Sequence, residues 1–206
     1  MTEDYVGVID HGVGNLGSVL NMFKRIDVPA RRMSTPDEVL AAPRLLLPGV
    51  GAFDRGMAGI RSRGLEEALS ASAGRGTPLL GICLGMQLLG RSSEEGAATG
   101  LGLLAADCRR ISGDAGLQVP QMQWNWLHWK DEHSFLARAD ERPKYYFAHS
   151  FHMITDDPAV VLADTEYGGD LAAVVGHGNV MGAQFHPEKS HLHGMKFLRA
   201  FAEWTP

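Results

Sequence analysis

The chain has 206 residues, 45% of them hydrophobic and 21% charged, which is typical of a globular protein with a sizeable buried core. Its 19 basic and 24 acidic residues give a formal net charge of -5, which argues against a basic nucleic-acid-binding domain. No apolar run of about 18 residues, no secretory signal and only two cysteines are present, so we expect a cytoplasmic protein without a disulfide framework.

The first half of the chain alternates short apolar runs with stretches of helical spacing. The expected strands are Tyr5–Ile9, Ala30–Met33, Leu45–Leu47 and Pro78–Ile82. The expected helices are Asn15–Ile26, one that begins at Pro36, a region to about Ala73 that breaks near Gly64, and one that begins over Leu84–Leu89. Strands that alternate with helices in this way predict a mostly parallel sheet covered on both faces.

The second half of the chain is richer in strands. The strand-like runs are Val119–Trp129, Tyr145–His149, Val160–Thr165, Leu171–Gly176 and Val180–Phe185, with a hairpin turn expected at Gly176–Asn179 and a closing helix over Glu188–Trp204. No Pro-, Gly- and Ser-rich linker and no repeat interrupts the sequence. We therefore predict one α/β domain over residues 1–206, with a mostly parallel central sheet, flanking helices and an additional strand-rich second half.

Cys83 lies in a pattern that is typical of a nucleophile. An apolar run leads to it, a helix follows it, and Gly81 and Gly85 stand two residues away on either side. Glycines occupy these places in a nucleophile elbow because side chains there would crowd the backbone of the sharp turn. The turn also places the sulfur at a helix N-terminus, which favours the thiolate. The alternative is a small buried hydrophobe, an interpretation that suits Cys108 better because no such turn surrounds it.

A thiol nucleophile needs a base that a third group holds in place. Among nine histidines, His186 follows the apolar run Val180–Phe185, so it would project into the crevice at the ends of parallel strands. Glu188 lies two residues further on and can turn back to accept a hydrogen bond from the imidazole. Alone, this pattern is also that of a strand end before a helix; together with the Cys83 turn it predicts a Cys–His–Glu triad.

The segments Gly81–Gln87 and Gln184–Lys189 resemble the class I, triad-type glutamine amidotransferases. The likeness covers essentially the whole chain and extends through Asp10–Leu16, Leu47–Phe53, Val119–Asn125 and Phe147–Phe151. The triad segments are common to the family, whereas the other segments are similar to its members that serve histidine biosynthesis. The resemblance implies a flavodoxin-like fold and the hydrolysis of L-glutamine to glutamate and ammonia.

An oxyanion site is expected near the triad. The glycines on either side of Val50 allow the loop to turn a backbone N–H towards the crevice, and the N–H of Leu84 would be the second donor, although an ordinary strand-to-helix turn is the alternative. The resemblance makes the loop Gly49–Gly51, with Val50 and Gly51 as site residues, an oxyanion strand that flips into its active form. It also implies that Gln87 and the backbone around His149, Ser150 and Phe151 bind the glutamine.

The expected chemistry is acyl transfer without a metal or an organic cofactor. His186, His191 and His193 are close in sequence, but His191 and His193 are two residues apart on the expected helix and would not face each other. Free ammonia would diffuse away, so an acceptor site on another chain is expected. The resemblance implies a (β/α)8-barrel cyclase subunit as the partner in a heterodimer, with Asn15, Trp124 and Lys189 at the interface.

The sequence departs from the family at Gln121 and Gln123, where histidine and glycine are usual. These changes bear on the partner, so two alternatives remain beside histidine biosynthesis. One is the same glutaminase supplying a paralogous synthase in surface-polysaccharide sugar amination. The other is a cysteine hydrolase that shares the elbow fold but does not hydrolyse glutamine, or a non-catalytic binding module. Glu188 argues against both forms of this second alternative, because it completes a triad that is tied to glutamine hydrolysis.

Overall fold

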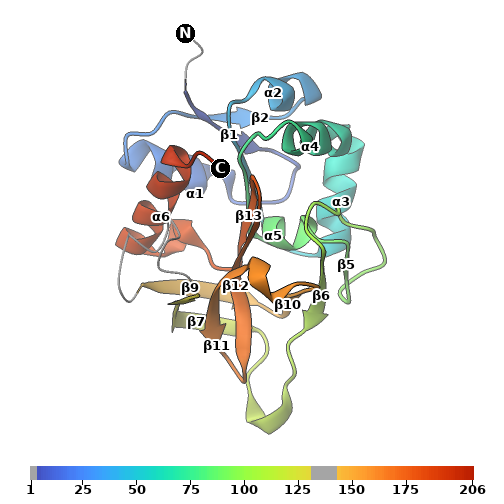
Figure 1. The fold of residues 1–206 in the computed structure, drawn as a ribbon, viewed down its shortest axis with the longest axis vertical. Helices are drawn as coiled ribbons and strands as arrows, with labels where there is room; N and C mark the ends of the chain where they lie inside the picture. Colours follow the sequence, from blue (N-terminus) through green and yellow to red (C-terminus); the bar gives the residue numbers. More distant parts are fainter. Residues whose placement is uncertain (1–3, 131–142) are drawn as a thin grey trace.

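The structure is a computed structural model that describes residues 4–130 and 143–206 (Figure 1). Within these ranges, eight strands form one sheet in the order β2 (Ala30–Met33), β1 (Val6–Ile9), β3 (Leu45–Gly49), β4 (Leu79–Cys83), β13 (Val180–Ala183), β12 (Asp170–His177), β11 (Val161–Glu166), β8 (His128–Trp129). The first five strands run parallel, and the last three pair antiparallel. The predicted mixed α/β architecture with a mostly parallel core is therefore confirmed.

Six helices accompany the strands in the described part of the chain. They are α1 (Leu16–Arg25), α2 (Pro36–Ala41), α3 (Phe53–Ser62), α4 (Leu65–Gly74), α5 (Leu84–Leu88) and α6 (His191–Glu203). The side chain of Asn15 caps α1, and Thr35 with Glu38 forms a capping box before Pro36 on α2. Gly64 adopts a left-handed conformation between α3 and α4, which is the expected break.

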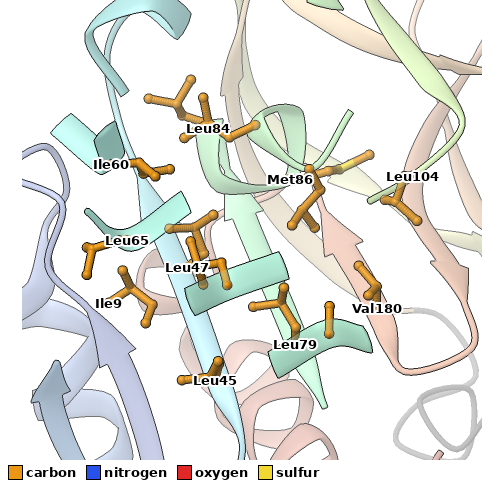
Figure 2. Close-up of a cluster of buried hydrophobic side chains, with 14 of the residues drawn as sticks. Ile9, Leu45, Leu47, Ile60, Leu65, Leu79, Leu84, Met86, Leu104 and Val180 are labelled. Carbon is orange, nitrogen blue, oxygen red and sulfur yellow. The ribbon is translucent and has the colours of Figure 1, made fainter. Parts of the chain in front are cut away.

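The helices cover the sheet on two faces and bury a hydrophobic cluster on each. In Figure 1, α1 and α6 lie on one side of the central strands, and α3, α4 and α5 lie on the other. Figure 2 shows the second side, where Leu47, Leu79 and Val180 from three adjacent strands lie among helix residues such as Ile60 and Met86. Removal of this apolar surface from water is the main favourable contribution to folding.

Two smaller sheets lie beyond the end of the central one (Figure 1). The first contains β10 (Phe151–Thr155), β6 (Ala106–Arg110) and β5 (Ser92–Ser93), and the second contains β7 (Gln121–Trp126) and β9 (Lys144–His149). The single strand expected over Val119–Trp129 is wrong: β7 and β8 belong to different sheets. The three strands β5, β6 and β10 were not predicted from the sequence.

Two further outcomes concern the end of the chain and its extent. The closing helix begins at His191 instead of Glu188, because Pro187–Lys189 forms a separate 3-10 turn. The prediction of one domain over residues 1–206 includes residues 1–3 and 131–142, which lie outside the described residues, and it stays a prediction. In the described parts of the chain, no helix is long and apolar enough to cross a membrane.

Candidate active site

The register of three parallel strands brings the ends of distant segments together. Gly49 at the end of β3 pairs with Cys83 at the end of β4, and on the other side of β4 Ala183 pairs with Ile82. Gln184 therefore follows β13 beside Cys83. Because carboxyl ends of parallel strands meet at one edge of a sheet, this edge collects residues that are up to 135 positions apart, from 49 to 184.

Cys83 occupies the sharp turn that the sequence predicts between β4 and α5. Its backbone has φ 54° and ψ -111°, a conformation that non-glycine residues rarely adopt. A Cβ on Gly85 would collide with the backbone oxygen of Leu47, and one on Gly81 would lie 2.6 Å from the backbone of Gly85. The two flanking glycines are therefore required by close backbone contacts. Cys83 is buried, and it is a free thiol.

His186 and Glu188 adopt the arrangement of a base and its orienting group. Nδ1 of His186 lies 2.9 Å from Oε1 of Glu188, and both side chains are almost fully buried. The backbone N–H of His186 donates to Tyr146 O, and its carbonyl accepts from the hydroxyl of Ser190, so both sides of the residue are anchored. With Nδ1 directed at Glu188, the other ring nitrogen is left for the thiol.

The electrostatics of His186 favour its charged form. Burial alone lowers the pKa of this imidazole, but interaction and hydrogen bonding with Cys83, together with Glu188, outweigh burial and raise the pKa above its usual range. The surroundings of His186 therefore favour an imidazolium beside the Cys83 sulfur. A positive charge next to a thiol is what the predicted pairing of a nucleophile with its base requires.

A pocket of about 500 Å³ opens beside the nucleophile. It is lined by Cys83 and His186 and by the residues expected to bind the oxyanion and the substrate: Val50, Gly51, Leu84, Gln87, His149, Ser150 and Phe151. The structure thus brings all of these predicted residues together, whereas their roles remain predictions. In the loop after β3, Gly51 has φ 101° and Val50 is 39% exposed, so this loop is not locked by packing.

A chain of buried side-chain amides leads from the pocket wall to the nucleophile. Nε2 of Gln87 donates to the carbonyl of Phe151 at 3.0 Å and to Oε1 of Gln184 at 3.1 Å. Nε2 of Gln184 then donates to Sγ of Cys83 at 3.8 Å. Gln87 could equally have been a solvated helix residue on sequence grounds, but it is 5% exposed.

His149 also forms a hydrogen bond with the carbonyl oxygen of Phe151. Its Nδ1 lies 2.8 Å from Phe151 O, which can only accept, so Nδ1 carries the proton. Burial lowers the pKa of His149 to about 4, so the ring is neutral and Nε2 is an acceptor. Nε2 lies 2.9 Å from Oε1 of Gln121; because two acceptors share no hydrogen bond, the Gln121 amide presents its NH2 group here.

The two departures from the family pattern thus have different surroundings. Gln121 is fully buried and hydrogen-bonded to His149, whereas Gln123 is exposed on β7. With its NH2 group directed at His149, Gln121 supplies a hydrogen-bond donor at the place where the family usually carries histidine. Its oxygen is then the unpartnered atom, which is a smaller cost than an orphaned N–H group.

Two residues that line or support the pocket were missed by sequence reasoning. Gln184 was visible in a motif, but its contact with Cys83 depends on the register of β13 against β4. Glu95 also lines the pocket, and its carboxylate accepts from the backbone N–H of Phe53 at 2.8 Å, at the start of α3. The Glu94–Glu95 pair in a loop carried no signal that separates it from ordinary solvated charges.

The three predicted interface residues have different contacts. Trp124 stacks on His191 with ring centroids 5.3 Å apart and meets Tyr146 edge-on at 6.1 Å. Lys189 lies over the same Tyr146 ring at 5.4 Å and lines the pocket. Asn15 instead caps α1 through Ser18. Among the described residues, no group of three or more His, Cys, Asp and Glu side chains is arranged to hold a metal ion.

Comparisons with known proteins agree with this geometry. The family model "Glutamine amidotransferase class-I" matches residues 5–204. The Pseudomonas aeruginosa protein "Imidazole glycerol phosphate synthase subunit HisH 2" is 43% identical over 197 residues, which cover 95% of this chain and 98% of that protein. The Bacillus licheniformis protein "Imidazole glycerol phosphate synthase subunit HisH" is 46% identical over 205 residues, with 97% and 96% covered.

Solved structures share the fold. A "Crystal structure of glutamine amidotransferase" superposes with a TM-score of 0.75 at 24% identity and covers 96% of this chain and 97% of that one. The "Structure of PurLQS from Thermotoga maritima" superposes with a TM-score of 0.76 at 19% identity, with 98% and 99% covered. At these identities the likeness supports the architecture alone.

Proposed function

Because the chain belongs to the class I glutamine amidotransferase family, we propose that it is the glutaminase subunit of an imidazole glycerol phosphate synthase. The activity is hydrolysis of L-glutamine to glutamate and ammonia, and the ammonia serves histidine biosynthesis. The observation that carries the chemistry is the pairing of His186 with Glu188 at 2.9 Å, next to a cysteine held on a strand-to-helix turn.

The reaction proceeds through a thioester. The Cys83 thiolate attacks the side-chain carbonyl carbon of glutamine, and His186 returns its proton to the nitrogen as the C–N bond breaks and ammonia leaves. Water, deprotonated by His186, then attacks the thioester, which releases glutamate and regenerates the thiol. Glu188 holds the imidazole in its working tautomer and stabilises its positive charge throughout both steps.

The backbone N–H groups of Leu84 and Val50 are the proposed donors to the oxyanion. Leu84 begins α5, so its N–H is one that the helix itself does not use. Val50 belongs to the glycine-flanked loop after β3, whose rotation can bring its N–H to the same oxygen. Gly49 packs tightly against Leu84, since a Cβ there would lie 2.8 Å from the Cβ of Leu84, so the two donor segments are in contact.

The amino-acid end of glutamine pairs with the polar groups of the pocket wall. Both hydrogens of the Gln87 amide are used by Phe151 and Gln184, so its oxygen is what remains to accept from the substrate ammonium. Glu95 adds a carboxylate in the same pocket and would neutralise that ammonium. The backbone around Ser150 contributes donors for the substrate carboxylate.

The ammonia acceptor in this proposal is a (β/α)8-barrel cyclase subunit. The relatives' names describe subunits of a synthase, which supports a separate subunit that carries the acceptor site. Val50 and Met122, 39% and 61% exposed, line the pocket and offer apolar surface where a partner would cover its mouth. Asn15, Trp124 and Lys189 are the further proposed interface residues, and the cytoplasm is the proposed location of the complex.

The test is glutamate release measured with the chain alone, with the barrel cyclase, and with the cyclase and its ribotide substrate. The proposal expects imidazole glycerol phosphate formation from glutamine in the complete mixture. Absence of glutamine hydrolysis under every condition would contradict the enzyme assignment. Hydrolysis that is coupled only to a sugar-aminating synthase would instead support the surface-polysaccharide alternative.

A further inference from the structure

We propose that Gln184 is a further catalytic residue, whose side-chain amide donates a hydrogen bond to the Cys83 thiolate. This inference rests on the proposed glutaminase function and adds a group that the triad does not contain. It is based on the position of Gln184 beside the nucleophile, on its complete burial, and on a hydrogen-bond network that allows only one orientation of its amide.

The position of Gln184 follows from the sheet. Its predecessor Ala183 pairs with Ile82, and its own backbone N–H donates to Ala173 O at 2.9 Å. The residue is thus held between β4 and β12 immediately beyond the last paired residue of β13. From there Nε2 reaches Sγ of Cys83 at 3.8 Å, within the range for hydrogen bonds to the large sulfur atom.

The orientation of the amide is determined from the far end of the network. Phe151 O is a backbone carbonyl and can only accept, so Gln87 must direct its NH2 group there. The second hydrogen of that NH2 group points to Gln184, whose side-chain oxygen must accept the hydrogen bond. The NH2 group of Gln184 is therefore the end that faces Cys83. The reverse orientation would place two donors against each other.

A donor in this place favours the ionised sulfur. Hydrogen bonds to charged groups are stronger than neutral ones, and burial strengthens them further because water does not compete. Gln184 is fully buried, so its N–H group finds no water as an alternative partner. The donor stabilises the thiolate that attacks glutamine and that leaves again when water cleaves the thioester.

A structural role for Gln184 makes a different prediction from a catalytic one. As a structural residue it is needed only as the acceptor for Gln87, a function that a glutamate side chain retains. As a catalytic residue it is needed for the N–H group directed at Cys83, which both methionine and ionised glutamate lack. The variants Gln184→Met and Gln184→Glu therefore separate the two roles, with Gln118→Met and Gln118→Glu at an exposed position as matched controls.

The first experiment follows the alkylation rate of Cys83 by iodoacetamide as a function of pH, with the full chain and without glutamine or partner. Cys108 does not compete, because burial raises its pKa to about 12. In Gln184→Met we expect the midpoint of the profile to move to higher pH by about one to two units, the value of one hydrogen bond to a charged group. In Gln184→Glu the midpoint should move at least as far, because the introduced carboxylate lacks the N–H donor and carries a negative charge beside the sulfur.

The second experiment measures glutamine hydrolysis by the same variants in the complex. We expect kcat to fall about 10- to 100-fold, as for the loss of one preorganised donor, with a smaller change in KM. Thermal unfolding and circular dichroism establish that each variant is folded. The Gln118 controls should match the wild-type protein in both experiments.

An unchanged alkylation profile in folded Gln184→Met would overturn the proposal, as would wild-type kcat in the Gln184→Glu variant at pH 9. The two levels of inference fail separately. If the wild-type complex hydrolyses no glutamine, the proposed function fails. If the wild-type complex hydrolyses glutamine and the Gln184 variants match it in both experiments, only the proposed role of Gln184 fails.

Discussion

The two cysteines of this chain, Cys83 and Cys108, are both buried and have opposite properties. Cys83 is held on the turn into α5, with His186 and the Gln184 amide at its sulfur. Cys108 lies in β6, where its thiol faces the backbone oxygen of Gln87 at 3.9 Å. Burial raises the pKa of Cys108 to about 12, so that side chain is an inert thiol. Both are buried, so burial alone does not decide which cysteine reacts.

Two buried histidines show the same dependence on surroundings. His186 faces a thiol and a carboxylate, which raise its pKa against the effect of burial. His149 faces a carbonyl and an amide, and burial lowers its pKa to about 4. The charged partners, and not the depth of burial, therefore separate the proposed catalytic pair Cys83–His186 from Cys108 and His149.

The largest expected effect on activity comes from removing the sulfur of Cys83, with removal of the sulfur of Cys108 as the comparison. Cys83→Ala should lower glutamine-dependent synthesis by the complex at least about 10⁴-fold, because no other group can form the thioester. Ammonia-dependent synthesis should remain, since the proposed acceptor site lies on the partner subunit. Cys108→Ala should keep glutamine-dependent activity within a few-fold of the wild type. Loss of both activities in Cys83→Ala would mean that Cys83 has a structural role.

The next effect concerns the group that holds His186. Glu188→Gln should lower kcat for glutamine hydrolysis by about 10²- to 10⁴-fold, because a neutral amide neither stabilises the imidazolium nor enforces its tautomer. Glu203→Gln makes the same charge change at an exposed position near the end of α6 and serves as the control. Steady-state kinetics in the complex measure both, and equal activities of the two variants would refute the triad.

The contrast between the histidines predicts a pH dependence of stability. The pKa of His149 is lower in the folded protein than in the unfolded chain. Between pH 6.5 and 4, His149 is therefore protonated in the unfolded chain but neutral in the native protein. As pH falls from 6.5 to 4, His149 should therefore remove about 3 kcal/mol of unfolding free energy. His186 has a raised pKa and is protonated in both states over most of this window, so it adds little.

His149→Asn tests this pH dependence. Its amide nitrogen can replace Nδ1 as the donor to Phe151 O, while the titrating ring is gone. Urea unfolding at several pH values should give a flatter profile for this variant, and His177→Asn at the exposed end of β12 should keep the wild-type slope. The difference between variants is diagnostic, because lowered pKa values at His11 and His152 also contribute to the wild-type slope. Equal slopes would show that His149 is not buried in its neutral form.

The smallest expected effect is the difference in stability between a glycine and an alanine variant, which should have opposite signs at the two cysteines. At position 83 the backbone has φ 54°, so Cys83→Gly should be about 1 kcal/mol more stable than Cys83→Ala, because glycine relieves the strain. At position 108, in an ordinary strand, Cys108→Gly should be about 1 kcal/mol less stable than Cys108→Ala. Denaturant unfolding measures both pairs. The same sign at both positions would exclude strain at the turn.

Much of the fold could be predicted because local patterns and tertiary structure agree. The apolar runs before Gly49 and Cys83 are short, fully buried strands, and the capping residues at Asn15 and Thr35 begin the helices where expected. Strand β10 was missed because only Ser150 separates it from β9, so no turn pattern marks the change of sheet. Strand β6 was missed because its second half, Arg109–Arg110, is polar and exposed.

The candidate site could be predicted where it depends on sequence motifs, and not where it depends on pairing. The segments around Cys83 and His186 carry the triad within a few residues each. The contact between Gln184 and Cys83 instead requires the register of two strands about 100 residues apart, which no local pattern encodes. The same holds for Gln121, whose partner His149 is its neighbour across the β7–β9 pair.

The glycines beside the nucleophile set limits on how this protein can be redesigned by random mutagenesis. A methyl group at Gly85 or Gly81 would strike backbone atoms, which cannot move aside as a side chain can. A library that varies this turn should therefore keep the codons of both glycines constant. For the fold, the sulfur of Cys83 can be replaced, whereas the two glycines near it cannot, because any side chain there would collide with the backbone.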